Sequence, residues 1–359
     1  MKVALVYDRV NKWGGAERLI LALKKIFPDL DLFTSVYNRD KAAWASDFNI
    51  KTSFLQKFPF ALSSHEIYAT LMPIAFESFS FDAYDLVISV TSEAAKGIIT
   101  KPGTLHICLC LTPTRYLWSG YETYFANSIF RFLAKPVIFY LRFWDKIASE
   151  RPDEFIAISS EVKERIKKYY NRQSVVIYPP LTIAGDNSLT KDDGYFLVVS
   201  RLVPYKKIDL AIKACKDLNL PLKIVGTGSE EIFLKSISSE NIEFLGDLSD
   251  RELISYYKNC KALIFPGSED FGLVMAEAQS FGKPVIAYKS GGALEIIKQG
   301  ITGEFFENPT VESLKEVLIN FNPSRYNSKT CKEQVRKFSF EEFEQKFTNL
   351  INNKLNNNL

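Results

Sequence analysis

The chain has 359 residues, of which 47% are apolar and 24% are charged, and its formal net charge at pH 7 is +3. This composition excludes intrinsic disorder, collagen-like repeats and a disulfide scaffold as the main state of the chain. The small net charge gives no indication of nucleic-acid binding. The length is too great for one ordinary hydrophobic core and fits two domains.

The first residues, Met1 to Asp8, are typical of a buried strand and lack the charged and apolar parts of a signal peptide. The chain has no run of about 18 uncharged apolar residues that would cross a membrane. Its five cysteines form no Cys-x-x-Cys pair, which favours reduced thiols and a cytoplasmic protein. Because the chain has two histidines, we expect no metal site.

Short apolar runs alternate with helix-patterned segments, which predicts the α/β class with two Rossmann-like, doubly wound domains. A polar stretch at 178–194 marks the boundary between them. We expect one domain at 1–180, a second at 181–339, and a helix at 340–355 that packs back on the first. The expected strands are Val3–Tyr7, Leu32–Val36, Leu86–Val90, Leu105–Leu109, Phe155–Ile158, Val175–Tyr178, Phe196–Ser200, Leu222–Gly226, Ile242–Leu245, Ala262–Phe265 and Pro284–Tyr288.

Two glycines separate the first expected strand from a helix at 16–26. Gly14 and Gly15 would let backbone amides approach an anion, to which the helix N-terminus adds partial positive charge. The spacing differs from the Gly-x-Gly-x-x-Gly motif, which argues against binding of a nicotinamide cofactor here. A tight turn before a packed helix is an equal alternative.

Cations and small residues follow the expected strands of the second half. Arg201, Lys206 and Lys207 come after the strand at 196–200, and Gly226 ends the next strand. Because ligands of an open α/β sheet bind beyond the carboxyl ends of its strands, these residues are candidates for a phosphate site. A solvated basic loop is the alternative.

Two carboxylates flank the expected start of a later helix. Glu269 and Glu277 are separated by seven residues, and Phe271 and Gly272 open a helix that contains Glu277. Carboxylates accept hydrogen bonds from vicinal hydroxyls, so this pair fits a ribose and a hexose. The alternative is two surface carboxylates at a helix start.

The segments WGGAE, SRLVPYKK, VGTG, EDFGLVMAEA and SGGALE occur in the order and spacing of glycosyltransferase family 4, which the chain resembles along essentially its whole length. Glu269 and Glu277 are similar to the Glu-x7-Glu motif of that family, and Arg201 and Lys206 to its Arg/Lys pair. Other segments, such as LTPTRYLW, resemble bacterial mannosyltransferases that build O-antigen and related surface polysaccharides.

The resemblance implies a GT-B fold, in which two Rossmann-like domains face across a cleft. It implies that Arg201 and Lys206 stabilise the diphosphate leaving group, that Glu269 holds the hexose and that Glu277 binds the ribose. It also implies donor contacts from a further set of residues, namely Gly14, Gly15, Gly226, Phe271, Gly272 and Leu273.

The implied reaction is retaining and needs neither a metal nor another cofactor. Its donor is a nucleotide-sugar, GDP-mannose or another one, and its acceptor is a lipid-linked glycan near Arg115, Tyr116 and Trp118. One position departs from the family pattern, because Leu111 stands where many members have a histidine that contacts the donor sugar. His106 lies five residues earlier, an odd number along a strand, so we do not expect it to substitute.

Other functions remain open at this point. One is a non-catalytic nucleotide-sugar-binding subunit of a polysaccharide assembly complex, which Leu111 favours. The other is a sugar-nucleotide epimerase, or a phosphorylase, on a GT-B-like scaffold. The intact Glu269, Arg201 and Lys206 argue for the transferase.

Residues 115–151 contain eleven aromatic side chains and a net charge of +3. On a helical wheel, Arg131, Lys135, Arg142 and Lys146 fall within about 60° of one another. Pro136 is expected to start a new helix or to kink one. We therefore predict peripheral contact with anionic lipid at the inner face of the plasma membrane. The alternative is a solvated basic face over a domain core.

Overall fold

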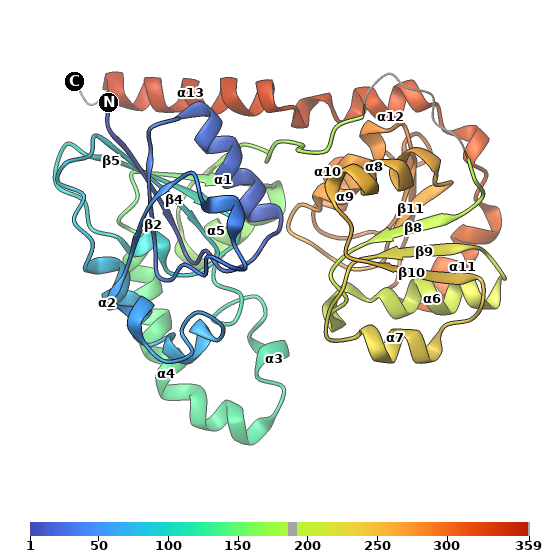
Figure 1. Cartoon of the computed structure of the whole chain (residues 1–359), viewed down its shortest axis with the longest axis horizontal. Coiled ribbons are helices and arrows are strands. Elements are labelled where there is room, and N and C mark those ends of the chain that lie inside the picture. The colour runs from blue at the N-terminus through green and yellow to red at the C-terminus, as the bar shows by residue number, and fades with distance from the viewer. Residues whose placement is uncertain (186–191, 358–359) are drawn as a thin grey trace. The chain divides into compact units, whose positions relative to one another are not determined.

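The computed structural model describes residues 1–185 and 192–357, which form two compact units (Figure 1). Unit 1 comprises Met1–Pro179 and Phe343–Leu359, and unit 2 comprises Pro180–Glu342. The sequence predicts a division after residue 180 and a C-terminal helix on the first domain. The structure divides the chain after Pro179 and assigns the last helix, from Phe343 onward, to unit 1.

Unit 1 contains a parallel sheet with the strand order β3-β2-β1-β4-β5-β6-β7. Every residue of β1, β4 and β5 is buried, which explains why their sequences are apolar without alternation. The edge strand β3 was not predicted, because its sequence NIKT has no apolar run. The strands are β1 (Val3–Tyr7), β2 (Asp31–Thr34), β3 (Asn49–Thr52), β4 (Leu86–Thr91), β5 (Leu105–Cys110), β6 (Glu154–Ala157) and β7 (Val175–Val176).

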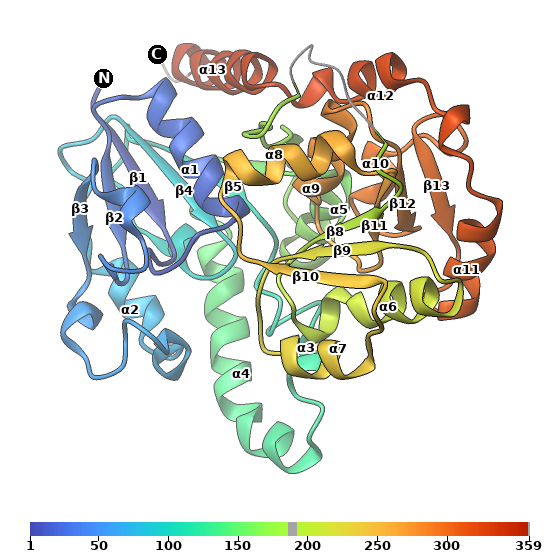
Figure 2. The same ribbon diagram turned by 45° about the vertical axis from the view of Figure 1, so that its right-hand side comes forward.

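The helices of unit 1 connect these strands. The α-helices are α1 (Gly15–Ile26), α2 (Met72–Glu77), α3 (Tyr121–Tyr124), α4 (Ser128–Ala148), α5 (Ser160–Tyr170) and α13 (Phe340–Asn357, in this unit from Phe343). The short 3₁₀ helices are Ala43–Ala45, Phe54–Lys57, His65–Tyr68 and Ala95–Gly97. The sequence predicts that Pro136 starts a new helix or kinks one. The structure has one helix, α4, with Pro136 inside it, and Figure 2 shows that its first turns run at an angle to the rest.

The last helix, α13, packs against earlier residues of unit 1. Its Phe347 ring packs edge-on against Phe27, with 6.5 Å between the ring centroids. Near its end, Lys354 forms an ion pair with Glu154 at the start of β6. These contacts hold residues from both ends of the chain in one unit.

Unit 2 contains a second parallel sheet, with the strand order β10-β9-β8-β11-β12-β13. In Figure 1, α6, α7 and α11 cover one face of this sheet, and α8, α9, α10 and α12 cover the other. The strands are β8 (Phe196–Val199), β9 (Leu222–Val225), β10 (Ile242–Gly246), β11 (Ala262–Phe265), β12 (Val285–Tyr288) and β13 (Gly303–Phe306). The helices are α6 (Ile208–Asp217), α7 (Glu231–Ile237), α8 (Asp250–Asn259), α9 (Leu273–Ser280), α10 (Ala293–Ile296), α11 (Val311–Asn320) and α12 (Ser328–Gln334), with 3₁₀ helices at Pro204–Lys206, Pro323–Arg325 and Arg336–Phe338.

Each sheet has one point at which the strand order reverses. In unit 1 this switch point lies between β1 and β4, and in unit 2 it lies between β8 and β11. Helices leave the two strands at a switch point toward opposite faces, so their carboxyl-end loops diverge and leave room for a ligand. The loops at these two positions are therefore where a functional site is expected.

Candidate functional site

The switch point of unit 2 brings together the residues that the sequence assigns to donor binding. Lys206 ends a 3₁₀ helix after β8, and Glu269 lies in the loop after β11. Lys206 is buried, and its Nζ forms an ion pair with the Glu269 carboxylate. The same ammonium lies 5.2 Å from the centre of the Tyr205 ring and 6.0 Å from that of Phe265. The Lys206 ammonium thus lies against the Glu269 carboxylate and beside two aromatic rings.

Arg201 lies on the exposed loop between β8 and this 3₁₀ helix. Its Nη2 donates a hydrogen bond of 2.5 Å to the hydroxyl of Tyr205, the residue whose ring also contacts Lys206. Lys207, the third predicted cation, is exposed and adopts the left-handed conformation with φ of 54° at the start of α6. The two members of the expected Arg/Lys pair, Arg201 and Lys206, therefore meet around one tyrosine.

Two glycine-containing loops pack against the backbone beside Glu269 and Arg201. Gly291 has φ of +58°, and a Cβ there would lie 2.2 Å from the carbonyl oxygen of Glu269. The next amide, of Gly292, donates a 2.9 Å hydrogen bond to the same oxygen. On the other side, a Cβ on Gly226 would lie 2.0 Å from the carbonyl oxygen of Ser200, next to Arg201. Both loops require glycine because backbone packs directly on backbone.

Helix α9 starts after Gly272, as the sequence predicts. Its carboxylate Glu277, however, is buried and hydrogen-bonded within unit 2. Gly272 is the N-cap with φ of 90°, and Leu273 is the first helical residue. Phe271 is buried, and its ring packs edge-on against Phe338. Glu277 is also buried, and its Oε2 accepts a 2.9 Å hydrogen bond from the Tyr257 hydroxyl. A ribose contact of Glu277 stays a prediction, and one carboxylate oxygen already has a protein donor.

The switch point of unit 1 contains a polar cluster that was not predicted from the sequence. Asp8 follows β1, and its buried carboxylate accepts hydrogen bonds from the Thr91 hydroxyl and from the amides of Ser92, Glu93 and Ala95. Burial, together with the charge of Glu93, raises the pKa of Asp8. Asp8 therefore holds the loop after β4. Its place at the end of the first strand was a signal that could have identified it.

Two more groups complete this cluster. Arg9 forms an ion pair with Glu93, whose Oε2 lies 3.8 Å from the Nε2 of His65. His65 is buried, and neither of its ring nitrogens has a hydrogen-bond partner. Burial, assisted by the charge of Arg9, lowers the pKa of His65 to about 4, so the imidazole is neutral at pH 7. His65 lies in a 3₁₀ helix without periodic pattern, so no sequence signal pointed to it.

The predicted glycines Gly14 and Gly15 also lie beside this switch point, at the start of α1. Gly14 is the N-cap in an extended conformation, and its carbonyl accepts a hydrogen bond from the amide of Arg18. Glu17, in the first turn, accepts a 2.6 Å hydrogen bond from the Tyr7 hydroxyl. The two glycines belong to unit 1, and their contact with a diphosphate stays a prediction.

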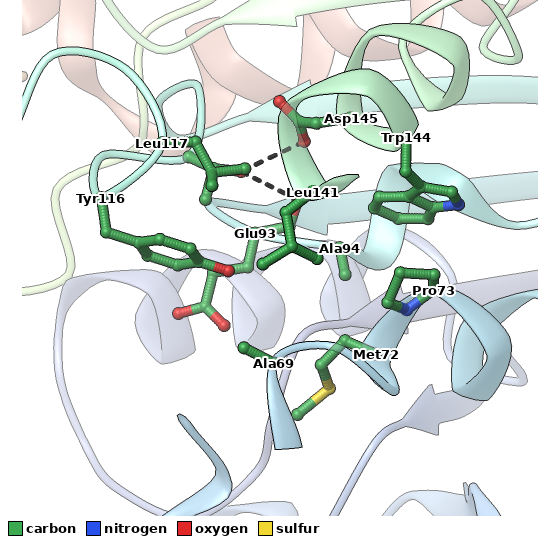
Figure 3. A pocket seen from close by; sticks show the side chains of 11 residues that line it. Ala69, Met72, Pro73, Glu93, Ala94, Tyr116, Leu117, Leu141, Trp144 and Asp145 are labelled. Atoms are coloured by element: carbon green, nitrogen blue, oxygen red, sulfur yellow. Dashed lines mark hydrogen bonds between the residues drawn. The ribbon is translucent and has the colours of Figure 1, made fainter. Parts of the chain in front are cut away.

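The residues predicted on the acceptor side have different surroundings. Tyr116 lines a pocket with Glu93, Met72 and Leu141 (Figure 3). Trp118 is used within the fold, since its Nε1 donates a 2.7 Å hydrogen bond to the Asp145 carboxylate and its ring stacks on Tyr169. Arg115 is half-buried, and its carbonyl accepts hydrogen bonds from the turn that follows.

The four cations expected to form a basic stripe on α4 fall into two pairs. Arg131 donates to the Phe125 carbonyl and forms a 2.8 Å ion pair with Glu122. Arg142 donates to the Leu117 carbonyl at 2.6 Å and lies over the Tyr121 ring. Lys135 and Lys146 are exposed. The predicted stripe of four is thus two exposed lysines and two arginines that protein groups already hold.

The position of the missing family histidine is occupied by Leu111, half-buried after β5. His106 lies within β5, fully buried, with its Nε2 2.8 Å from the Ser89 hydroxyl. Its side chain is therefore in the sheet and not at the strand end. Within residues 1–185 and 192–357, no group of three His, Cys, Asp or Glu side chains is arranged to hold a metal ion.

Residues 181–338, nearly all of unit 2, match the family described as "Glycosyl transferases group 1". An uncharacterised glycosyltransferase of Methanocaldococcus jannaschii is 31% identical over 210 residues, which are 55% of this chain and 58% of that protein. A GDP-mannose-dependent monoacylated alpha-(1-6)-phosphatidylinositol monomannoside mannosyltransferase of Corynebacterium glutamicum is 36% identical over 136 residues, 33% of this chain and 35% of the relative. The chain thus matches about half of the first relative and about a third of the second.

Solved structures match over the whole chain. HepE of Anabaena, solved in complex with UDP, has a TM-score of 0.72 and 16% identity, with 98% of this chain and 100% of HepE covered. This likeness concerns the fold, and it confirms the predicted GT-B class of two Rossmann-like units. The family match over residues 181–338 and the Methanocaldococcus relative support the expected resemblance to glycosyltransferases. The predicted cleft between the two units stays a prediction.

Proposed function

We propose, from the match of residues 181–338 to the glycosyl transferases group 1 family, that this chain is a retaining hexosyltransferase. Its donor is GDP-mannose and its acceptor is a lipid-linked glycan of a surface polysaccharide such as O-antigen. The observation that carries the proposal is the pairing of Lys206 with Glu269 at the switch point of unit 2. It joins the group that would bind the leaving diphosphate to the group that would hold the transferred sugar.

The ion pair explains how the site responds to its donor. Without a ligand, the Glu269 carboxylate compensates the buried charge of Lys206. A diphosphate offers the ammonium several oxygens, and Arg201 adds a second cation from the neighbouring loop. As Lys206 turns to the phosphates, the Glu269 carboxylate becomes available to hexose hydroxyls. Donor binding therefore assembles the sugar site.

The same cations act again as the glycosidic bond breaks. Negative charge then accumulates on the diphosphate, and fixed positive groups stabilise that charge more strongly than they stabilise the ground state. Arg201 and Lys206 supply positive charge of the kind that a divalent ion supplies elsewhere. We therefore include in the proposal that transfer proceeds without a metal or another cofactor.

The choice of GDP-mannose is tested by a thermal-shift panel of GDP-mannose, UDP-glucose, ADP-glucose and dTDP-glucose. The Corynebacterium relative is named GDP-mannose-dependent, whereas HepE was solved with UDP, so the panel must include both bases. A hundredfold excess over the dissociation constant stabilises the folded state by about 2.7 kcal/mol. We expect GDP-mannose to give the largest shift, and a panel without any shift would overturn the proposal.

A second measurement separates catalysis from binding. Labelled GDP-mannose is incubated with lipid extract of the source cells, and the anomeric configuration of the new linkage is read by NMR. Transfer with retention is the expected result. Binding without transfer to any lipid acceptor would favour a non-catalytic nucleotide-sugar-binding subunit. Conversion of the free nucleotide-sugar would favour an epimerase.

A lipid-linked acceptor requires the protein to work at a membrane surface. We include this location, on the cytoplasmic face of the plasma membrane, in the proposal. In this proposal the acceptor binds on the side of Tyr116, which lines a small pocket beside Glu93 at the edge of the polar cluster of unit 1 (Figure 3).

A further inference from the structure

Helix α4 exposes an unusual number of large apolar side chains. The members of this apolar ridge have exposed fractions between 41% and 75% and belong to one 21-residue helix. They are Ile129, Phe132, Leu133, Val137, Phe139, Tyr140, Phe143 and Ile147. Soluble proteins rarely leave contiguous apolar patches of this kind uncovered, so the ridge indicates a binding surface.

The ridge occupies one side of the helix. At about 100° per residue, its members span about 160° of the helical wheel. The opposite side packs on unit 1 through Ile138 and Leu141, which are buried in a cluster with Leu117. The buried Asp145 anchors this side, since it accepts hydrogen bonds from Trp118 and Tyr170 and pairs with Lys96 at 2.5 Å. The ridge is therefore carried by a helix whose second half is fixed to the unit.

The charges beside the ridge have one sign. Lys135 and Lys146 are exposed and lie along one edge of the ridge, next to Phe139 on the wheel. The one acidic residue of α4 is Asp145, which is buried and faces the sheet. Arg131 and Arg142 point back to protein groups on the preceding segment. An exposed apolar face with lysines at its edge is complementary to a surface of acyl chains and anionic headgroups.

The shape of unit 1 is consistent with that partner. Figures 1 and 2 both show the first half of α4 extending away from the sheet of unit 1. Among the described residues, no helix has the length and hydropathy needed to cross a bilayer. A helix that lies in the interface needs neither, because it buries one face alone.

We propose that α4 lies in the surface of an anionic membrane, with the apolar ridge among the acyl chains and Lys135 and Lys146 at the phosphates. This inference deepens the proposed function, because it brings unit 1 to the lipid that carries the acceptor. A second copy of the chain is the competing occupant of the ridge. An antiparallel symmetric pair of helices would, however, place the lysines of one copy beside those of the other, and like charges repel.

Vesicle co-sedimentation tests the proposal with the full chain. The probes are vesicles of phosphatidylcholine alone and of phosphatidylcholine with phosphatidylglycerol. We expect strong binding to the anionic vesicles and weaker binding to the neutral ones. The triple variant Phe132→Ser, Phe139→Ser, Phe143→Ser should lose at least about tenfold in binding to both, since these rings supply much of the inserted area.

Two matched controls show whether position matters. The variant Ile232→Ser, Ile301→Ser, Ile319→Ser removes three exposed apolar side chains from unit 2 and should bind vesicles like the native chain. Lys135→Glu with Lys146→Glu should lower binding to anionic vesicles about fivefold or more per lysine and should leave neutral vesicles unaffected. Lys298→Glu with Lys329→Glu makes the same change of charge on unit 2 and should have little effect.

The outcomes separate this inference from the proposed function. Equal vesicle binding by the ridge variant and the native chain would overturn the membrane contact. A native dimer in light scattering that the ridge variant dissociates would assign the ridge to a second copy instead. The ridge variant should keep the native thermal shift with GDP-mannose, because its changes lie on the surface of unit 1. If the nucleotide panel fails while vesicle binding holds, the proposed donor is wrong and the membrane contact stands.

Discussion

Lys206 and Glu269 form an ion pair across two loops that follow neighbouring strands, β8 and β11. The ammonium is buried, so it would be costly to leave without a compensating charge. The carboxylate belongs to a loop whose backbone is fixed by Gly291 and Gly292. The site thus keeps the positive charge of Lys206 in a compensated form.

Replacing Glu269 by Gln should separate binding from catalysis. Transfer should fall below detection, because the amide has lost the charge that accepts hydrogen bonds from the hexose. The affinity for GDP should rise about three- to tenfold, since Lys206 no longer has a carboxylate competing with the phosphates. Calorimetric titration with GDP and a turnover assay measure the two effects. Glu243→Gln, on β10 and paired with Lys223, is the matched control and should change neither. Normal turnover of Glu269→Gln would remove this residue from the site.

Replacing Lys206 by Ala should weaken nucleoside diphosphate binding about 10- to 100-fold, the range that a charged hydrogen bond supplies. The matched control is Lys207→Asn, which removes the adjacent exposed cation. Lys207 has φ of 54°, and asparagine tolerates this left-handed conformation better than most residues. Titration with GDP and UDP decides the matter. If both affinities stay at the native level in Lys206→Ala, the phosphate assignment is incorrect.

Replacing Gly291 by Ala should reduce turnover by displacing the loop that holds Glu269. The new Cβ would lie 2.2 Å from the Glu269 carbonyl oxygen, so the loop must move. Gly300→Ala is the control, because Gly300 has φ of +71° and no atom within 4 Å of the position that a Cβ would take. Both variants should lose about 1 kcal/mol of stability through the left-handed conformation, and Gly291→Ala alone should lose activity. Unchanged turnover in both would show that the loop adapts to the shift.

Much of the fold could be predicted because parallel strands covered on both faces are apolar throughout. β1, β4 and β5 are buried at every position, and their sequences contain that signal. The missed strands, β3 and β13, are edge strands of their sheets. β3 has the polar sequence NIKT, so it is not distinguishable from a loop before its neighbour β2 is known.

The residues of the candidate sites also differ in whether the sequence could predict them. Lys206 and Glu269 could be predicted because each follows a recognisable strand, and neighbouring strands bring their ends together. His65 could not be predicted, because it lies near Arg9 and Glu93 through contacts between loops, which have no periodic pattern in the sequence. On α4 the helical wheel grouped the four cations, but it could not show the backbone carbonyls to which Arg131 and Arg142 donate hydrogen bonds. It is the apolar ridge, and not the four cations, that distinguishes this helix.

The two histidines should make the folded state less stable in mild acid. Burial lowers the pKa of His65 to about 4 and that of His106 to about 3, so both stay neutral in the folded chain at pH values where the unfolded chain takes up protons. Below about pH 6.5 the unfolded state therefore binds more protons, and the free energy of unfolding falls as the pH falls, by up to about 1.4 kcal/mol per pH unit for each histidine.

Urea denaturation at a series of pH values between about 6.5 and 5.5 measures this slope above the range in which most ordinary carboxylates titrate. His65→Gln and His106→Gln should each remove the contribution of one histidine, and the double variant should remove both. The His65 variant is the more informative, because neither ring nitrogen of His65 has a hydrogen-bond partner, whereas His106 contacts Ser89. A native slope in His65→Gln would mean that the folded chain protonates His65 as readily as the unfolded chain does. The imidazole would then face Glu93 as a cation, and the polar cluster of unit 1 would carry one more positive charge in mild acid.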